Sequence, residues 1–183
     1  LMHMIATALS IEDRPSAFRY PRGEALGLEL PEFGEPLKIG KGKIIKEGSN
    51  IAIVSYGTRL NDVIIAEQEL LSYGISSTIV DARFAKPIDG SLIDNLVKNH
   101  EALITIEEGS IGGFSTQVIS HIMKKNLFSK NFKFKSLFYP DLFIDHDTTE
   151  NQNKLAKVTS MDIVSECLNL IRSGEKLIAK QTA

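Results

Sequence analysis

Two arginines in loops that follow predicted strands carry the clearest chemical signal in the sequence. Arg83 comes just after the β-branched, apolar run 76–81, and Arg22 follows the short run 17–20. Open α/β sheets bind ligands beyond the carboxyl ends of their strands, and a guanidinium group offers a planar fork of donors that suits a phosphate or a carboxylate. The residues alone leave a second interpretation open, a surface or structural ion pair, and Asp81 is a ready partner for Arg83.

Glu107 and Glu108 end another predicted strand, where carboxylates can serve as general acids or bases. Because neighbouring residues of a strand point to opposite faces, these two side chains cannot easily share one substrate atom. The glycine-rich run 109–113 matches neither a P-loop nor a dinucleotide-binding fingerprint, and the two carboxylates before it would repel an anion. We expect its glycines to allow close packing of a helix against a strand.

The other reactive side chains form no catalytic set. The four histidines are scattered, and only the segment 145–147 combines a histidine with carboxylates; three consecutive residues rarely converge on one ion, so we expect a solvated turn there. Cys167 falls on the apolar side of the last predicted helix and is expected to be a core residue. The sequence therefore predicts no catalytic residue, no metal ligand and no cofactor-binding residue in this chain.

Composition excludes several classes of function. The net charge of −2, with 21 basic and 23 acidic residues mixed along the chain, gives no electrostatic reason to expect nucleic acid or an anionic membrane as a partner. No apolar run approaches the roughly 20 residues that cross a bilayer, and the N-terminus lacks the plan of a secretory signal. A single cysteine fits a reducing compartment. We expect a soluble, cytoplasmic protein.

The elements that must position the arginines begin at residue 41. Strand-like runs alternate with amphipathic helical stretches, which predicts a three-layer α/β/α domain around a mostly parallel five-stranded sheet. The first two runs are separated by a glycine-containing turn and predict a β-hairpin, whose first strand is the one antiparallel edge strand. The predicted strands are 43–46, 51–56, 76–81, 102–107 and 132–138.

The loop 81–89 ends the third of these runs. Pro87 disfavours helix at Lys86, which keeps the loop extended until Asp89 or Ser91 caps the next helix.

Residues 1–40 have a different character. The run 1–9 is typical of the end of a helix, the run 17–20 predicts a strand with no sheet partner, and 24–40 has the glycine and proline content of a linker. We therefore expect 1–40 to be the tail of a preceding domain plus a linker, and 41–183 to be the α/β domain, in a chain that is a piece of a longer one. Residues 1–24 should pack poorly or against a neighbouring molecule, leaving Phe18 and Tyr20 outside this chain's core.

Motifs spread over nearly the whole chain closely resemble the C-terminal third of the 1-deoxy-D-xylulose-5-phosphate synthase family. The most specific are Tyr-Pro-Arg-Gly at 20–23 and Asp-Ala-Arg-Phe-Ala-Lys-Pro-Ile-Asp at 81–89. The segment 145–149 departs from the family's pattern, which leaves His146 without an inferred role. In order, the motifs are Phe18–Gly23, Ile39–Gly42, Ala52–Thr58, Asp81–Asp89, His100–Glu108, Gly112–Phe114 and Pro140–Ile144.

The resemblance implies a transketolase-like transferase, a homodimer that uses thiamine diphosphate and Mg²⁺. Such an enzyme decarboxylates pyruvate and adds the remaining fragment to glyceraldehyde 3-phosphate, and its product feeds isoprenoid and thiamine biosynthesis. Arg22 and Arg83 match the two family arginines that hold the phosphate of the aldehyde. The residues that bind thiamine diphosphate and Mg²⁺ would lie before Leu1, and 1–40 would end the pyrimidine-binding domain. The chain alone should then bind no cofactor and be inactive.

Two alternatives compete with this interpretation. The β subunit of a 2-oxo-acid dehydrogenase has a similar C-terminal sheet and turn, although such enzymes have no phosphorylated acceptor that would need Tyr-Pro-Arg-Gly. The chain could also be a purely structural dimerisation module. Phosphate binding that depends on Arg83 separates these possibilities.

Overall fold

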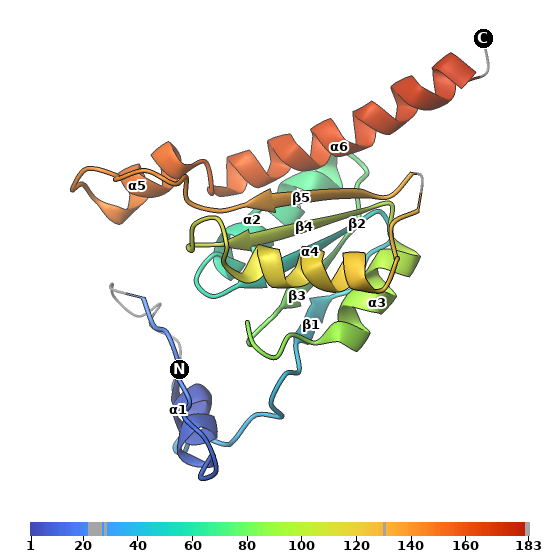
Figure 1. Cartoon of the computed structure of the whole chain (residues 1–183). Helices are drawn as coiled ribbons and strands as arrows, with labels where there is room; N and C mark the ends of the chain where they lie inside the picture. The colour runs from blue at the N-terminus through green and yellow to red at the C-terminus, as the bar shows by residue number, and fades with distance from the viewer. Residues whose placement is uncertain (22–26, 28, 130, 182–183) are drawn as a thin grey trace.

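The computed structural model describes residues 1–21, 27, 29–129 and 131–181, with side chains placed up to residue 171. Its centre is a five-stranded sheet with the strand order β1-β3-β2-β4-β5 (Figure 1). Strands β2 to β5 pair in parallel, and β1 pairs antiparallel with β3 at one edge. The predicted sheet is confirmed. The strands are β1 (Lys43–Lys46), β2 (Ile51–Tyr56), β3 (Ser77–Asp81), β4 (Ala102–Glu107) and β5 (Lys133–Leu137).

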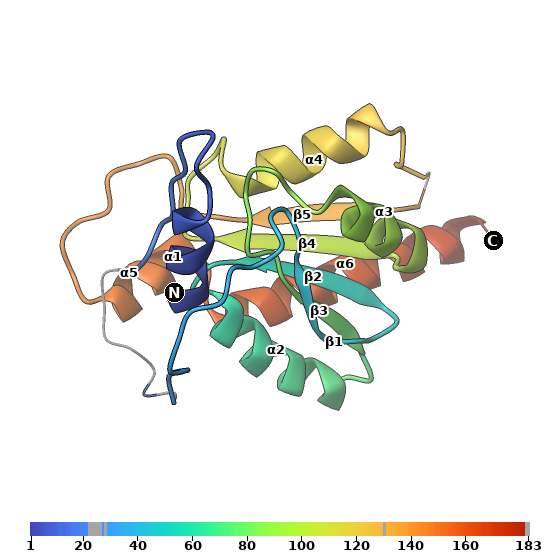
Figure 2. The ribbon, with the colours of Figure 1, turned by 90° about the horizontal axis from the view of Figure 1, so that it is seen from below.

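Helices cover both faces of the sheet, as Figure 2 shows. On one face, α2 (Leu60–Ser72) and α6 (Ser160–Gln181) lie beside each other, with the short α5 (Thr149–Ala156) before α6. On the other face lie α3 (Gly90–Asn99) and α4 (Phe114–Lys124). Successive strand residues point to opposite faces, so β2 supplies Ile53 to the first core and Val54 to the second.

The predicted hairpin between the first two strands is wrong in its pairing, because β3 lies between β1 and β2. The connection 47–50 passes over the start of β3 instead of turning back on β1. Gly48 bonds through its N–H and C=O to the hydroxyl of Thr78, both at 2.9 Å. A Cβ at Gly48 would lie 2.4 Å from the carbonyl carbon of Ser77, so this glycine serves a close backbone approach.

The N-terminal region lies apart from the three layers (Figure 1). Helix α1 (Met2–Leu9) forms as expected and contacts the segment 34–37, where His3 and Thr7 accept the backbone N–H groups of Glu35 and Leu37. The sequence predicts a strand without a sheet partner at 17–20, and in the described part of the chain these residues form no strand. Phe18 and Tyr20 stay outside the core, with exposed fractions of 41% and 68%.

None of the helices in the described ranges is both long enough and apolar enough to cross a membrane.

Candidate anion site at the carboxyl end of the sheet

Arg83 lies at the centre of a tight turn directly beyond β3. The N–H of Ala82 donates to the carbonyl of Ser55 on β2, and the N–H of Phe84 donates back to the carbonyl of Ala82, closing a three-residue turn around Arg83. Arg83 has a φ of +57°, in the left-handed region that a residue with a side chain rarely adopts. Such strain is held only where the surrounding structure enforces it, and it occurs often at ligand sites.

The guanidinium of Arg83 is held only loosely by its own chain. Its Nε lies 3.7 Å from Oδ2 of Asp81, while the other oxygen of Asp81 accepts the backbone N–H of Arg83 at 3.1 Å. The Arg83 side chain is 26% exposed. Among the described residues it has no other ion-pair partner, which leaves donors of the guanidinium available for an anion from solution.

Arg22 lies outside the described residues, so its position relative to Arg83 stays a prediction.

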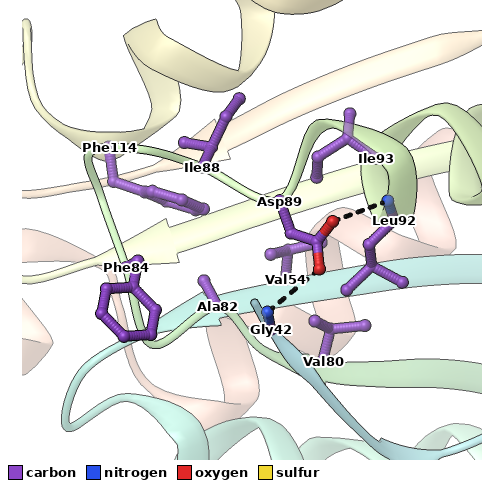
Figure 3. Close-up of a pocket in the computed structure, with 10 residues that line it drawn as sticks. All are labelled: Gly42, Val54, Val80, Ala82, Phe84, Ile88, Asp89, Leu92, Ile93 and Phe114. Atoms are coloured by element: carbon purple, nitrogen blue, oxygen red, sulfur yellow. Dashed lines mark hydrogen bonds between the residues drawn. The ribbon is translucent and has the colours of Figure 1, made fainter. Parts of the chain in front are cut away.

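The far end of the loop is fixed by Asp89, as Figure 3 shows. Its carboxylate caps α3 by accepting the N–H of Leu92 at 3.2 Å, as expected, and also accepts from the N–H of Gly42 at 3.2 Å and from Nζ of Lys41 at 2.9 Å. Burial raises the pKa of Asp89, but these bonds, together with one from Ser91, outweigh it and lower the pKa below its ordinary value. The sequence analysis missed the role of Lys41 and Gly42, because the contact joins residues almost fifty positions apart.

Behind the loop lies a void too small for a ligand (Figure 3). Its volume is about 10 Å³, at the lower limit for a single water molecule. The void shows that the loop packs directly on the sheet and on α4. It is lined by Gly42, Val54, Val80, Ala82, Phe84, Ile88, Asp89, Leu92, Ile93 and Phe114.

The carboxylate of Glu107 lies at the N-terminus of α4, where an anion from solution would otherwise bind. Its side chain is only 1% exposed, and its two oxygens accept the N–H groups of Phe114 and Ser115 at 2.9 and 2.8 Å. A Cβ at Gly109 or Gly113 would lie 2.5 or 2.4 Å from Oε2 of Glu107. The glycines therefore make room for this carboxylate, a more specific role than the helix–strand packing that the sequence suggested, and the helix N-terminus already has its negative charge.

The side chain of Glu108 points away from that of Glu107, as the alternation of side chains along a strand predicts. It pairs with Arg59 at 3.0 Å, and Arg59 also pairs with Asp62 at 3.1 Å. Arg59 is only 8% exposed, and its Nε has no hydrogen-bond partner within the described part of the chain. The sequence analysis missed this buried arginine because its position, just before α2, resembles that of an ordinary surface residue.

His100 and His121 have structural partners, and Cys167 lies in the core. His100 contacts the hydroxyl of Thr78, and His121 bonds to Asp94 at 2.7 Å. Cys167 is fully buried, and burial raises the pKa of its thiol to about 12, which agrees with the expected core role. In the described ranges, no group of three or more His, Cys, Asp or Glu side chains could hold a metal ion.

Comparison with known proteins agrees with this architecture. Residues 40–163 match the family model described as the transketolase C-terminal domain. A solved structure, described as a split-gene transketolase in an inactive β4 tetramer, superposes with a TM-score of 0.68 at 23% sequence identity. The alignment covers 84% of this chain but 47% of that chain, so this chain spans about half of its length. The match over most of the sequence shows that the chain belongs to the transketolase C-terminal domain family.

Proposed function

We propose that this chain is the C-terminal part of a thiamine-diphosphate-dependent synthase that condenses pyruvate with glyceraldehyde 3-phosphate, releasing CO₂ and forming 1-deoxy-D-xylulose 5-phosphate. Membership of the transketolase C-terminal domain family supports the enzyme class. The motifs Tyr-Pro-Arg-Gly at 20–23 and Asp81–Asp89 support this substrate pair within it. In this proposal, residues 1–40 end the preceding pyrimidine-binding domain and 41–183 form the C-terminal domain.

Arg83 and Arg22 bind the phosphate of the acceptor aldehyde. The observation that carries this role is the strained turn that presents Arg83 beyond the carboxyl end of β3 with a single, long ion pair. Two guanidinium groups would neutralise a phosphate dianion. Fixing the phosphate also fixes the direction of the carbonyl carbon, so binding energy far from the reacting atoms is converted into orientation.

The described residues do not fit the cofactor itself. They offer no metal-binding cluster, and the α4 N-terminus, which could otherwise receive a diphosphate, is filled by Glu107. In this proposal, thiamine diphosphate and Mg²⁺ are bound by other parts of the parent enzyme. On this basis the chain alone is inactive and contributes dimer contacts. The similar split-gene transketolase, described as an inactive tetramer, supports this view.

The test uses the intact parent enzyme with Arg83→Ala, and titrates the aldehyde and pyruvate separately. Charge-assisted hydrogen bonds contribute about 1.5–3 kcal/mol, so we expect the KM for glyceraldehyde 3-phosphate to rise about 10- to 100-fold with the KM for pyruvate unchanged. Lys98→Ala, a change at an exposed residue of α3, is the control. If both substrates bind Arg83→Ala normally and only its stability falls, Arg83 is a structural residue.

The same experiment tests the alternatives. The β subunit of a 2-oxo-acid dehydrogenase would require no phosphorylated acceptor, so its activity would not depend on the aldehyde. A dimerisation module would self-associate equally well without Arg83, which size-exclusion chromatography of the Arg83→Ala variant measures.

A further inference from the structure

A surface hollow of about 410 Å³ lies between the loop 85–90 and helix α4, and Arg83 is not among the residues that line it. One wall comes from α4, where Gln117, Ser120, His121 and Lys124 follow the helical spacing that places side chains on one stripe. The opposite wall is the loop, with Lys86 and the apolar groups of Ala85, Pro87 and Ile88. The hollow is shallow and open to solvent, so a ligand bound there would stay partly exposed.

The hollow carries uncompensated positive charge. Within the part of the chain that the structure describes, neither Lys86 nor Lys124 has an ion-pair partner. The nearby acid, Asp94, is already bonded to His121 at 2.7 Å and lies 3.6 Å from Nζ of Lys125. Its single negative charge is therefore matched by Lys125, and no ion pair within the described residues joins it to Lys86 or Lys124.

The shape of the hollow depends on a close contact at its floor. A Cβ at Gly90 would lie 2.6 Å from Cε1 of His121, so a side chain at this position would displace the imidazole. The bond from His121 to Asp94 fixes the imidazole in turn. The hydroxyl of Ser120 and the amide of Gln117 add hydrogen-bonding groups that are exposed to a ligand.

We propose that this hollow binds a phosphorylated small molecule. The two ammonium groups are point charges that suit a phosphate, and the apolar loop wall suits the carbon skeleton attached to it. The proposal does not depend on the function proposed above, because Arg83 does not line the hollow.

The experiment measures binding of glycerol 3-phosphate to the whole chain by calorimetry at constant ionic strength, with inorganic phosphate and glycerol as parallel probes. We expect saturable binding of glycerol 3-phosphate that is tighter than that of inorganic phosphate, and no binding of glycerol. The double variant Lys86→Gln, Lys124→Gln should weaken binding about tenfold or more, since charged hydrogen bonds are lost. Ser120→Tyr, which fills the hollow without changing its charge, should also abolish the binding step that belongs to the hollow.

Two matched variants make the result decisive. Lys98→Gln removes an exposed lysine elsewhere on the surface and should leave all binding unchanged. Arg83→Gln removes the other candidate anion site, so it should remove any binding step that belongs to that site and leave the step that belongs to the hollow unchanged. All the changed hollow residues are exposed, so circular dichroism should report an intact fold. Absence of saturable binding overturns the proposal. So does an equal loss in Lys98→Gln, a loss confined to Arg83→Gln, or equal affinity for inorganic phosphate, which would indicate an adventitious ion only.

Discussion

Replacing Glu107 by Gln should strongly destabilise the domain, although the two side chains have nearly the same shape. The carboxylate accepts two backbone N–H groups of α4, and its Oε2 lies in the space left by two glycines. An amide keeps only one acceptor and turns its NH₂ group toward a buried N–H. Losing a bond to a charged group and leaving a buried donor unpaired should cost about 2–4 kcal/mol.

Circular dichroism can monitor both urea unfolding of the whole chain, which gives the free energy of unfolding, and thermal unfolding, which gives Tm. Domains of this size lose about 3 °C in Tm for each kcal/mol, so the expected fall in Tm is roughly 6–12 °C. Glu101→Gln is the matched control, because Glu101 is exposed and lies directly before the same strand. The reasoning is refuted if Glu107→Gln destabilises the domain by no more than about 0.5 kcal/mol beyond the control, the range of ordinary surface substitutions.

Further predictions concern Gly48 in the connection 47–50, Asp89 at the end of the loop 81–89, and the thiol of Cys167. Gly48→Ala should lower the free energy of unfolding by several kcal/mol, because its Cβ would meet the backbone of Ser77. Gly74→Ala, which places its Cβ in open space at φ +74°, should lower it by only about 1 kcal/mol. The urea midpoints of the two variants test this difference. The lowered pKa of Asp89 predicts stability that is present above its ordinary value of 3.8 and is lost as pH falls through the folded pKa. As the pH is lowered from 6 to 3, the urea midpoint should therefore fall less for Asp89→Asn than for the wild type. Parallel plots of midpoint against pH would contradict this. Cys167 should react with a thiol reagent at pH 8 only after unfolding, and rapid reaction of the native protein would show that it is accessible.

The sheet and its helices were predictable because hydrophobic periodicity is a local signal. The β-branched run before Asp81 and the amphipathic stretch before Gly74 each indicate one element without reference to the rest of the chain. The order of the strands within the sheet depends on contacts between residues that are distant in the chain, so no local pattern indicates it. Gly48 suggests a turn in the sequence, but only the position of β3 shows that it passes over Ser77.

Some features of the candidate site also follow from neighbouring residues in the sequence, whereas others depend on tertiary contacts. The position of Arg83 just beyond a strand follows from the sequence, because the strand and the loop are adjacent in the chain. The bond from Lys41 to Asp89 and the approach of Glu107 to α4 depend on tertiary contacts. The strand expected at 17–20 fails for a related reason, since β-propensity forms a strand only where another strand is available for pairing.

The contact with Asp81 compensates at most for the cost of the left-handed conformation of Arg83. A left-handed φ costs a residue with a side chain about 1 kcal/mol or more. The contact with Asp81, at 3.7 Å and partly open to solvent, can return at most about that amount. The loop is fixed at one end by the bonds of Ala82 to β2 and at the other by Asp89. The backbone that carries the guanidinium is therefore ordered before an anion binds, so binding would order the Arg83 side chain but not the loop.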